Sequence, residues 1–133
     1  MAAAKVLDSW ALLCYLGQEP GFEKMIELFE KAVESSKPLL MCVINWGEVY
    51  YQVARQFGDQ KAQEIEQLIQ TLPIMVVEAD KDLTREAARI KVTKRMAYAD
   101  CFAAALARLK KGELYTGDPE FKAVEKDIKV VWL

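Results

Sequence analysis

Four acidic residues lie where they could form one cation-binding site. Asp8 and Asp118 each follow a short apolar segment, and Glu48 and Asp100 lie near the beginnings of predicted helices. Carboxylates that lie close together raise one another's pKa, and a divalent cation relieves this repulsion. The chain contains no histidine, so a site built from these side chains would offer oxygen ligands and would favour Mg²⁺ or Mn²⁺ over zinc.

Each of these acids also has an ordinary structural interpretation. Asp8 could be the N-cap of a helix, and Asp118 could be a turn residue before proline. Glu48 and Asp100 could each be a carboxylate that the dipole favours in the first turn of a helix. Both interpretations remain open at this point, because the spacing of the residues is compatible with either.

The elements that must position the acids follow from the hydrophobic pattern. Apolar runs predict strands, and apolar residues at intervals of three and four predict helices. The expected strands cover residues 4–7, 39–43, 74–77, 114–116 and 128–133. The expected helices cover residues 9–16, a segment from Pro20 to Lys37, and residues 45–57, 59–72, 81–93, 98–109 and 120–124. The strands at 39–43 and 74–77 are apolar throughout, which is typical of strands covered on both faces.

This alternation predicts a three-layer α/β/α sandwich with a mainly parallel central sheet, as a single domain over residues 1–133. In such a sheet the carboxyl ends of the strands and the amino ends of the helices share one edge, where ligands bind. The acids named above should meet there. Asp80 and Asp82 lie near the same edge, and we interpret them as helix caps, although the pattern does not exclude Asp80 from the site.

Composition narrows the function classes. The chain of 133 residues is 53% hydrophobic and 29% charged, which is typical of a globular protein. Its net charge of −2 provides no broad nucleic-acid footprint, so an RNA ligand would need a local basic patch. Lys5 and Asp8 interrupt the apolar N-terminus, which predicts neither a signal peptide nor a membrane partner. The three cysteines lie in apolar segments and fit free thiols in a reducing, cytoplasmic location.

Motifs along nearly the whole chain resemble those of the PIN domain family, and most closely the VapC-type toxins of prokaryotic toxin–antitoxin pairs. Each motif alone is weak, but their order and spacing together are fairly specific. The motifs are Val6-Leu7-Asp8-Ser9, Asn45-Trp46-Gly47-Glu48-Val49, Tyr98-Ala99-Asp100-Cys101-Phe102-Ala103-Ala104-Ala105 and Thr116-Gly117-Asp118-Pro119-Glu120-Phe121.

The resemblance implies a Mg²⁺-dependent (or Mn²⁺-dependent) endoribonuclease. It assigns Asp8, Glu48, Asp100 and Asp118 as catalytic acids and metal ligands. Three of them, Asp8, Asp100 and Asp118, would hold one or two cations on the scissile phosphate, and Glu48 would hold a second cation or orient the attacking water.

Three polar residues would orient these carboxylates: Ser9, Asn45 and Thr116. Their ordinary interpretations are a residue beside an N-cap, a cap and a residue that favours strands, respectively.

The substrate would be single-stranded or loop RNA. The basic cluster Lys91, Lys94 and Arg95 precedes the helix of Asp100 and could contact phosphates, although a solvated helix face also explains it. The family further implies a small antitoxin partner and a homodimer.

Other functions fit parts of the pattern. An RNA-processing nuclease would use the same acids, and an interaction module would keep the fold without catalysis. A phosphoacceptor receiver domain needs an acidic pair after the first strand, but Ser9 follows Asp8.

Overall fold

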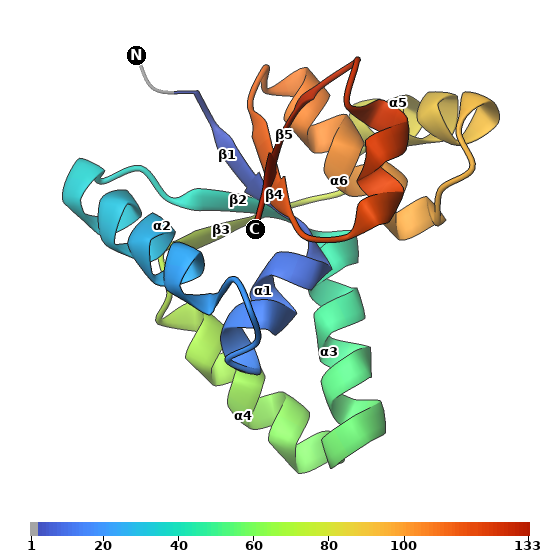
Figure 1. The fold of residues 1–133 in the computed structure, drawn as a ribbon. Helices are drawn as coiled ribbons and strands as arrows, with labels where there is room; N and C mark the ends of the chain where they lie inside the picture. The colour runs from blue at the N-terminus through green and yellow to red at the C-terminus, as the bar shows by residue number, and fades with distance from the viewer. Residues whose placement is uncertain (1–2) are drawn as a thin grey trace.

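The computed structural model describes residues 3–133. Its centre is a five-stranded sheet in the order β3-β2-β1-β4-β5, in which every neighbouring pair is parallel (Figure 1). The strands are β1 (Lys5–Leu7), β2 (Leu39–Cys42), β3 (Ile74–Val77), β4 (Glu113–Thr116) and β5 (Lys129–Trp132). The predicted α/β class with a parallel sheet is therefore confirmed.

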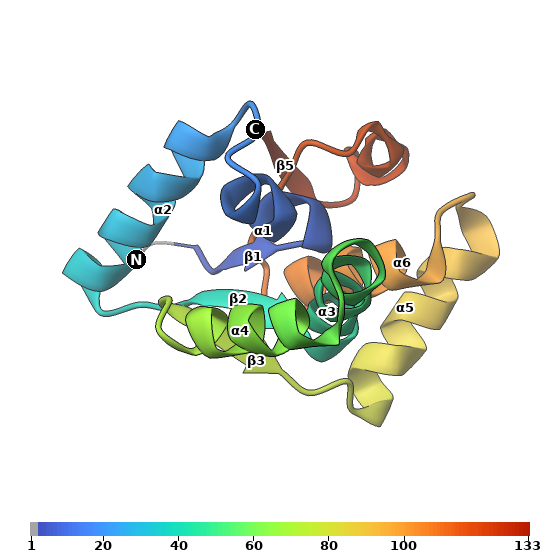
Figure 2. The same cartoon turned by 90° about the horizontal axis from the view of Figure 1, so that it is seen from below.

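Helices cover both faces of the sheet, as the two views together show (Figures 1 and 2). The first face carries α1 (Ser9–Leu16), α2 (Phe22–Ser35), α3 (Val43–Phe57) and α4 (Asp59–Gln70). The second face carries α5 (Lys81–Thr93), α6 (Tyr98–Leu109) and the 3₁₀ helix η1 (Pro119–Val124).

Alternating side chains of the strands supply the two cores between these layers. In β1, Val6 packs among residues of α5 and α6, whereas Leu7 packs among residues of α1 to α4. In β2, Met41 and Cys42 divide in the same way. Successive side chains of a strand point to opposite faces, so these short strands anchor both helical layers at once.

Two sequence-based expectations were wrong in detail. The strand at 74–77 forms as predicted, but it lies at the edge of the sheet, and Met75 and Val76 are 53% and 37% exposed. The helix predicted from Asn45 begins at Val43, so Glu48 lies in its second turn rather than its first. Among residues 3–133, no helix is both long and apolar enough to cross a membrane.

Candidate metal centre

Three acidic side chains converge where β4 ends and α6 begins. Asp100 lies in the first turn of α6, Asp118 is the N-cap of η1, and Glu120 lies in the first turn of η1. One carboxylate oxygen from each lies within 4.8 Å of the others. Within residues 3–133, neither a lysine nor an arginine forms an ion pair with any of them. This is a compact set of oxygen donors without a protein cation.

Asp8 borders this group from the end of β1. It is 1% exposed and caps α1, with Oδ1 accepting a hydrogen bond from the backbone N–H of Ala11 at 2.9 Å. Its Oδ2 accepts a hydrogen bond from Thr116 Oγ1 at 2.5 Å, and the Thr116 hydroxyl accepts one from the backbone N–H of Asp118 at 3.0 Å. The cap interpretation of Asp8 is thus confirmed, and the same carboxylate is joined through Thr116 to the loop of Asp118.

Burial raises the pKa of Asp8 to about 7, and the negative charge of Asp118 acts in the same direction. The hydrogen bonds from Thr116 and Ala11 oppose that rise, because they stabilise the carboxylate. The ionised form of Asp8 is therefore costly near neutral pH unless a positive charge lies beside it.

Asp100 feels the whole acidic group. Burial raises its pKa to about 8, and the charges of Glu120, Asp118, Asp8 and Glu48 add to the rise, in that order. The side chain is 7% exposed. A divalent cation would lower both raised pKa values, and an all-oxygen donor set suits Mg²⁺ or Mn²⁺. The residues present therefore fit such an ion.

Glu48 stands beside the three-acid group rather than within it. Ser9 Oγ donates a hydrogen bond to Glu48 Oε1 at 2.7 Å, and Gln52 Nε2 donates one to Oε2 at 3.4 Å. The Ser9 contact joins α1 to α3 and fixes the direction of the carboxylate. Ser9 and Thr116 thus each hold one acidic side chain in a fixed direction through a hydrogen bond. Residues around the ligands of a metal site commonly form such hydrogen bonds.

Asn45 connects α3 to the beginning of α6. It is fully buried, and its Nδ2 donates a hydrogen bond to the carbonyl oxygen of Ala99, the residue before Asp100, at 2.9 Å. Its buried Oδ1 accepts no hydrogen bond from any residue in the described range 3–133. The asparagine therefore supports the backbone that presents Asp100, and it forms no hydrogen bond with the side chain of Asp100 or Glu48.

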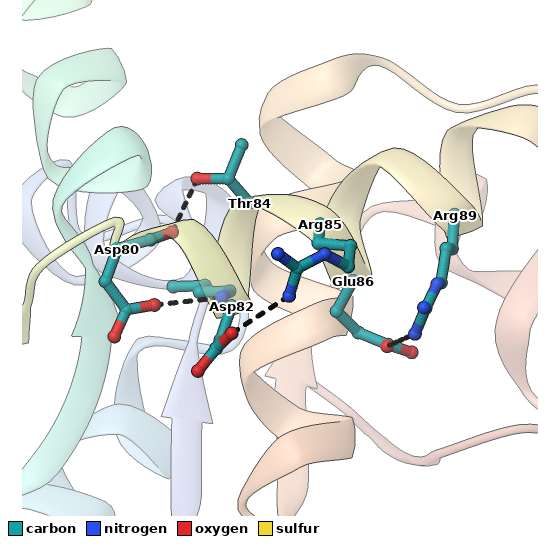
Figure 3. Close-up of polar contacts among 7 residues, drawn as sticks. Asp80, Asp82, Thr84, Arg85, Glu86 and Arg89 are labelled. Carbon is teal, nitrogen blue, oxygen red and sulfur yellow. Dashed lines mark hydrogen bonds and ion pairs between the residues drawn. The ribbon is translucent and has the colours of Figure 1, made fainter.

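Asp80 and Asp82 take part in local contacts on α5 instead (Figure 3). Asp80 Oδ1 accepts a hydrogen bond from the backbone N–H of Leu83 at 2.9 Å, and so it caps the helix as predicted. Asp82 forms an ion pair with Arg85 at 2.9 Å, so the expectation that Asp82 is also a cap was wrong. Neither acid belongs to the three-acid group.

The basic residues before α6 have different surroundings. Lys91 Nζ donates a hydrogen bond to the carbonyl oxygen of Met96 at 2.5 Å, and Lys94 forms an ion pair with Asp127 at 3.5 Å. Arg95 is exposed and forms no ion pair within residues 3–133. These residues line an open depression that Glu120 also borders. Arg95 is thus the most available of the three.

Sequence reasoning missed Glu120 as a site residue. Its carboxylate lies in the acidic group and also accepts a hydrogen bond from the backbone N–H of Ala97. The helix dipole is enough to explain a glutamate in the first turn of a short helix. The position of Glu120 alone therefore did not indicate a role in the site. The available signal was its spacing, since Asp118 and Glu120 begin the same helix directly after a strand.

Comparison with known proteins identifies the family. The model of the PIN domain family matches residues 5–127, and the chain belongs to this family. No curated protein sequence matches the chain.

Solved structures share the fold at low sequence identity. A structure of VapBC2 from Rickettsia felis, bound to a DNA fragment from the promoter, aligns with a TM-score of 0.79 and 12% identity, covering 97% of this chain and 98% of that chain. VapC20 from Mycobacterium tuberculosis, described as a sarcin-ricin loop cleaving toxin, aligns with a TM-score of 0.69 and 18% identity, covering 91% and 95%. FitAcB from Neisseria gonorrhoeae aligns with a TM-score of 0.71 and 20% identity, covering 95% of each.

Proposed function

We propose that this protein is a Mg²⁺-dependent endoribonuclease, which hydrolyses RNA phosphodiester bonds with a metal-activated water, and that it is the toxin of a toxin–antitoxin pair. The observation that carries the proposal is the group formed by Asp100, Asp118 and Glu120, with Asp8 and Glu48 beside it. Membership of the PIN domain family and the likeness to VapC20 support nuclease activity.

Asp100, Asp118 and Glu120 would hold the cation, with Asp8 next to them. A bound Mg²⁺ or Mn²⁺ supplies a Lewis acid at the scissile phosphate and lowers the pKa of the attacking water. Thr116 keeps the Asp8 carboxylate aimed at the loop of Asp118. Glu48, fixed by Ser9 and Gln52, would orient the water or hold a second cation. Asn45 supports the turn that presents Asp100.

The proposed partners follow from the structural relatives. The likeness to VapBC complexes supports a small antitoxin, and a homodimer and a single-stranded or loop RNA substrate are part of the same proposal. Arg95 would contact an RNA phosphate, because Lys91 and Lys94 are already engaged. The three buried free thiols fit action in the reducing cytoplasm.

Asp100→Asn tests the metal centre. Mutation of a residue that only orients a metal ligand lowers metal affinity or activity by about 10- to 100-fold. Loss of a ligand itself should therefore lower the rate of RNA cleavage by more than about 100-fold. Calorimetric Mn²⁺ binding should disappear in parallel. Asp80→Asn makes the same chemical change at the cap of α5, and it should leave both measurements unchanged.

The outcomes separate the alternatives. Unchanged Mn²⁺ affinity in Asp100→Asn would remove Asp100 from the ligand set. A wild-type protein that cleaves no RNA but binds a protein partner would be a non-catalytic module. Cleavage restricted to a precursor RNA, without inhibition by a small partner, would identify an RNA-processing nuclease.

A further inference from the structure

Trp10 lies against the loop that carries Asp118. A Cβ atom built on Gly117 would come within 2.2 Å of Trp10 Cη2, 2.4 Å of Cζ2 and 2.5 Å of Cζ3. The six-membered ring of the indole therefore occupies the space that any side chain at position 117 would need. Gly117 stands between Thr116, which binds Asp8, and Asp118. The indole thus contacts the residue that lies between Thr116 and Asp118 in the chain.

The indole is also accessible. Trp10 lies in the first turn of α1, two residues after Asp8, and its side chain is only partly buried. Over the described range 3–133, its Nε1–H donates no hydrogen bond. Trp132, in contrast, donates its Nε1–H to Glu125 at 3.1 Å. A partly exposed tryptophan whose Nε1–H makes no hydrogen bond within residues 3–133 can offer a ligand both its ring and its donor.

A groove leads from this position along α3. Its volume is about 740 Å³, and Trp10, Gln52, Val53, Gln56 and Phe57 are among the residues that line it. Gln52 also donates the hydrogen bond to Glu48, so one end of the groove adjoins the acidic site. Phe57, at the end of α3, is 64% exposed. Aliphatic side chains, Glu19 and Lys61 also line the groove. The two amides, Gln52 and Gln56, can form hydrogen bonds with the edges of bases.

We infer that Trp10 is a stacking platform for the nucleobase next to the scissile phosphate of a single-stranded RNA. This inference rests on the proposed function and adds a residue that binds substrate. A phosphate held by the acids has a base one nucleotide away, and the surface beside Asp118 is Gly117 covered by the indole. Aromatic stacking accepts any base and needs that base to be unpaired.

The choice of RNA over a peptide follows from the position of the ring. A peptide in the groove would have no need of the acids, whereas a nucleotide whose phosphate lies at the acids would place its base beside Trp10, which lines the groove and also touches the loop of Asp118. Stacking on one aromatic ring is worth about 1–3 kcal/mol per base, which corresponds to about 5- to 150-fold in affinity. The contact is therefore large enough to measure in one variant.

The test combines a protein variant with an altered substrate. Trp10→Leu should lower kcat/KM by about tenfold or more on an oligoribonucleotide that the wild type cleaves. An abasic ribose next to the cleaved bond should lower kcat/KM of the wild type by a similar factor. The two changes together should cost no more than either alone, because both remove the same contact. Trp10→Phe should retain most activity, and Trp46→Leu, at a different site, should leave the abasic effect intact.

Three results would overturn the inference. The first is losses that multiply, which would show that Trp10 and the base act independently. The second is a loss in Trp10→Leu that an equal loss of Mn²⁺ affinity accompanies, since the ring would then act through Asp118. The third is unchanged cleavage with weakened binding of a protein partner, which would assign Trp10 to a protein interface.

A binding measurement separates this inference from the nuclease proposal. In a Trp46→Phe and Trp132→Phe background, Trp10 is the remaining one of the three tryptophans. Oligoadenylate should quench its fluorescence in Ca²⁺ without cleavage, whereas an abasic oligomer of equal length should not. Quenching without any RNA cleavage in Mg²⁺ would defeat the nuclease proposal alone. Equal quenching by both oligomers would defeat the stacking platform alone.

Discussion

The Thr116 hydroxyl bridges two acids of the candidate site. It donates to Asp8 Oδ2 and accepts from the backbone N–H of Asp118, and the residue is fully buried. The preference of threonine for strands is enough to explain this residue in β4. The two hydrogen bonds of its hydroxyl indicate an additional structural role. It keeps one buried carboxylate hydrogen-bonded and sets the direction of the loop that carries another.

Thr116→Val should destabilise the protein by about 1–3 kcal/mol, because it preserves volume but removes the donor to the buried Asp8 Oδ2 and the acceptor of the backbone N–H of Asp118. It should also weaken Mn²⁺ binding, since the pKa of Asp8 would rise further without its donor. Urea unfolding and calorimetry measure these effects. Thr116→Ser keeps the hydroxyl and should remain close to the wild type. Equal stability of the valine and serine variants would show that the hydroxyl is not needed.

Residue types and their order were enough to predict that acids from distant parts of the chain gather at one edge of the sheet, but they did not predict that Glu120 joins the group or that Glu48 lies beside it. Asp8, Asp100 and Asp118 follow strands or begin helices, and chain direction in a parallel sheet brings such positions to one edge. The order of the residues did not predict the role of each acid at that edge. Whether Asp80 caps a helix or Glu120 joins the acidic group depends on side-chain directions, which only packing determines.

At the scale of elements, strongly periodic segments were the most predictable. The helices at 9–16, 81–93 and 98–109 form within the expected bounds. The beginning of α3 was less predictable, because Val43 and Ile44 suit either a strand or a helix, and the chain changes from one to the other at Cys42. The exposure of β3 depends on its edge position, which follows from strand order and not from its own residues.

The connector between α5 and α6 provides a prediction about RNA affinity. Arg95→Ala should weaken binding of single-stranded RNA and reduce the salt dependence of binding by about one phosphate contact. Lys94→Ala is the matched control, because Lys94 pairs with Asp127 and should change affinity less. Titrations at several salt concentrations give both slopes. If Lys94→Ala lost more RNA affinity than Arg95→Ala, Lys94 and not Arg95 would be the phosphate contact.

For the whole molecule, the acidic group links stability to pH. The pKa values of Asp8 and Asp100 are about 7 and about 8 in the folded protein, against a usual value of 3.8. At pH values between about 4 and about 8, the folded protein binds more protons than the unfolded chain. The contribution of these two acids to the free energy of unfolding therefore falls as the pH rises through this range.

Mg²⁺ should reverse that loss, because a bound cation stabilises the ionised carboxylates. The increase in Tm on adding Mg²⁺ to metal-free protein should be larger at about pH 8.5 than at about pH 6, where protons compete with the metal. Thermal unfolding in EDTA and in Mg²⁺ at both pH values measures the difference. Asp100→Asn should show little increase at either pH. An equal increase in the wild type at both values would contradict the link.

The capping hydrogen bonds of Asp8 and Asp118 have an evolutionary consequence. Each carboxylate begins a helix by accepting a backbone N–H, so each is needed by the architecture as well as by any chemistry. Asparagine and serine preserve a cap, whereas alanine loses about 1 kcal/mol. A descendant that abandons hydrolysis while keeping its shape should therefore replace these aspartates with asparagine or serine, and such exchanges would mark inactive members among related sequences.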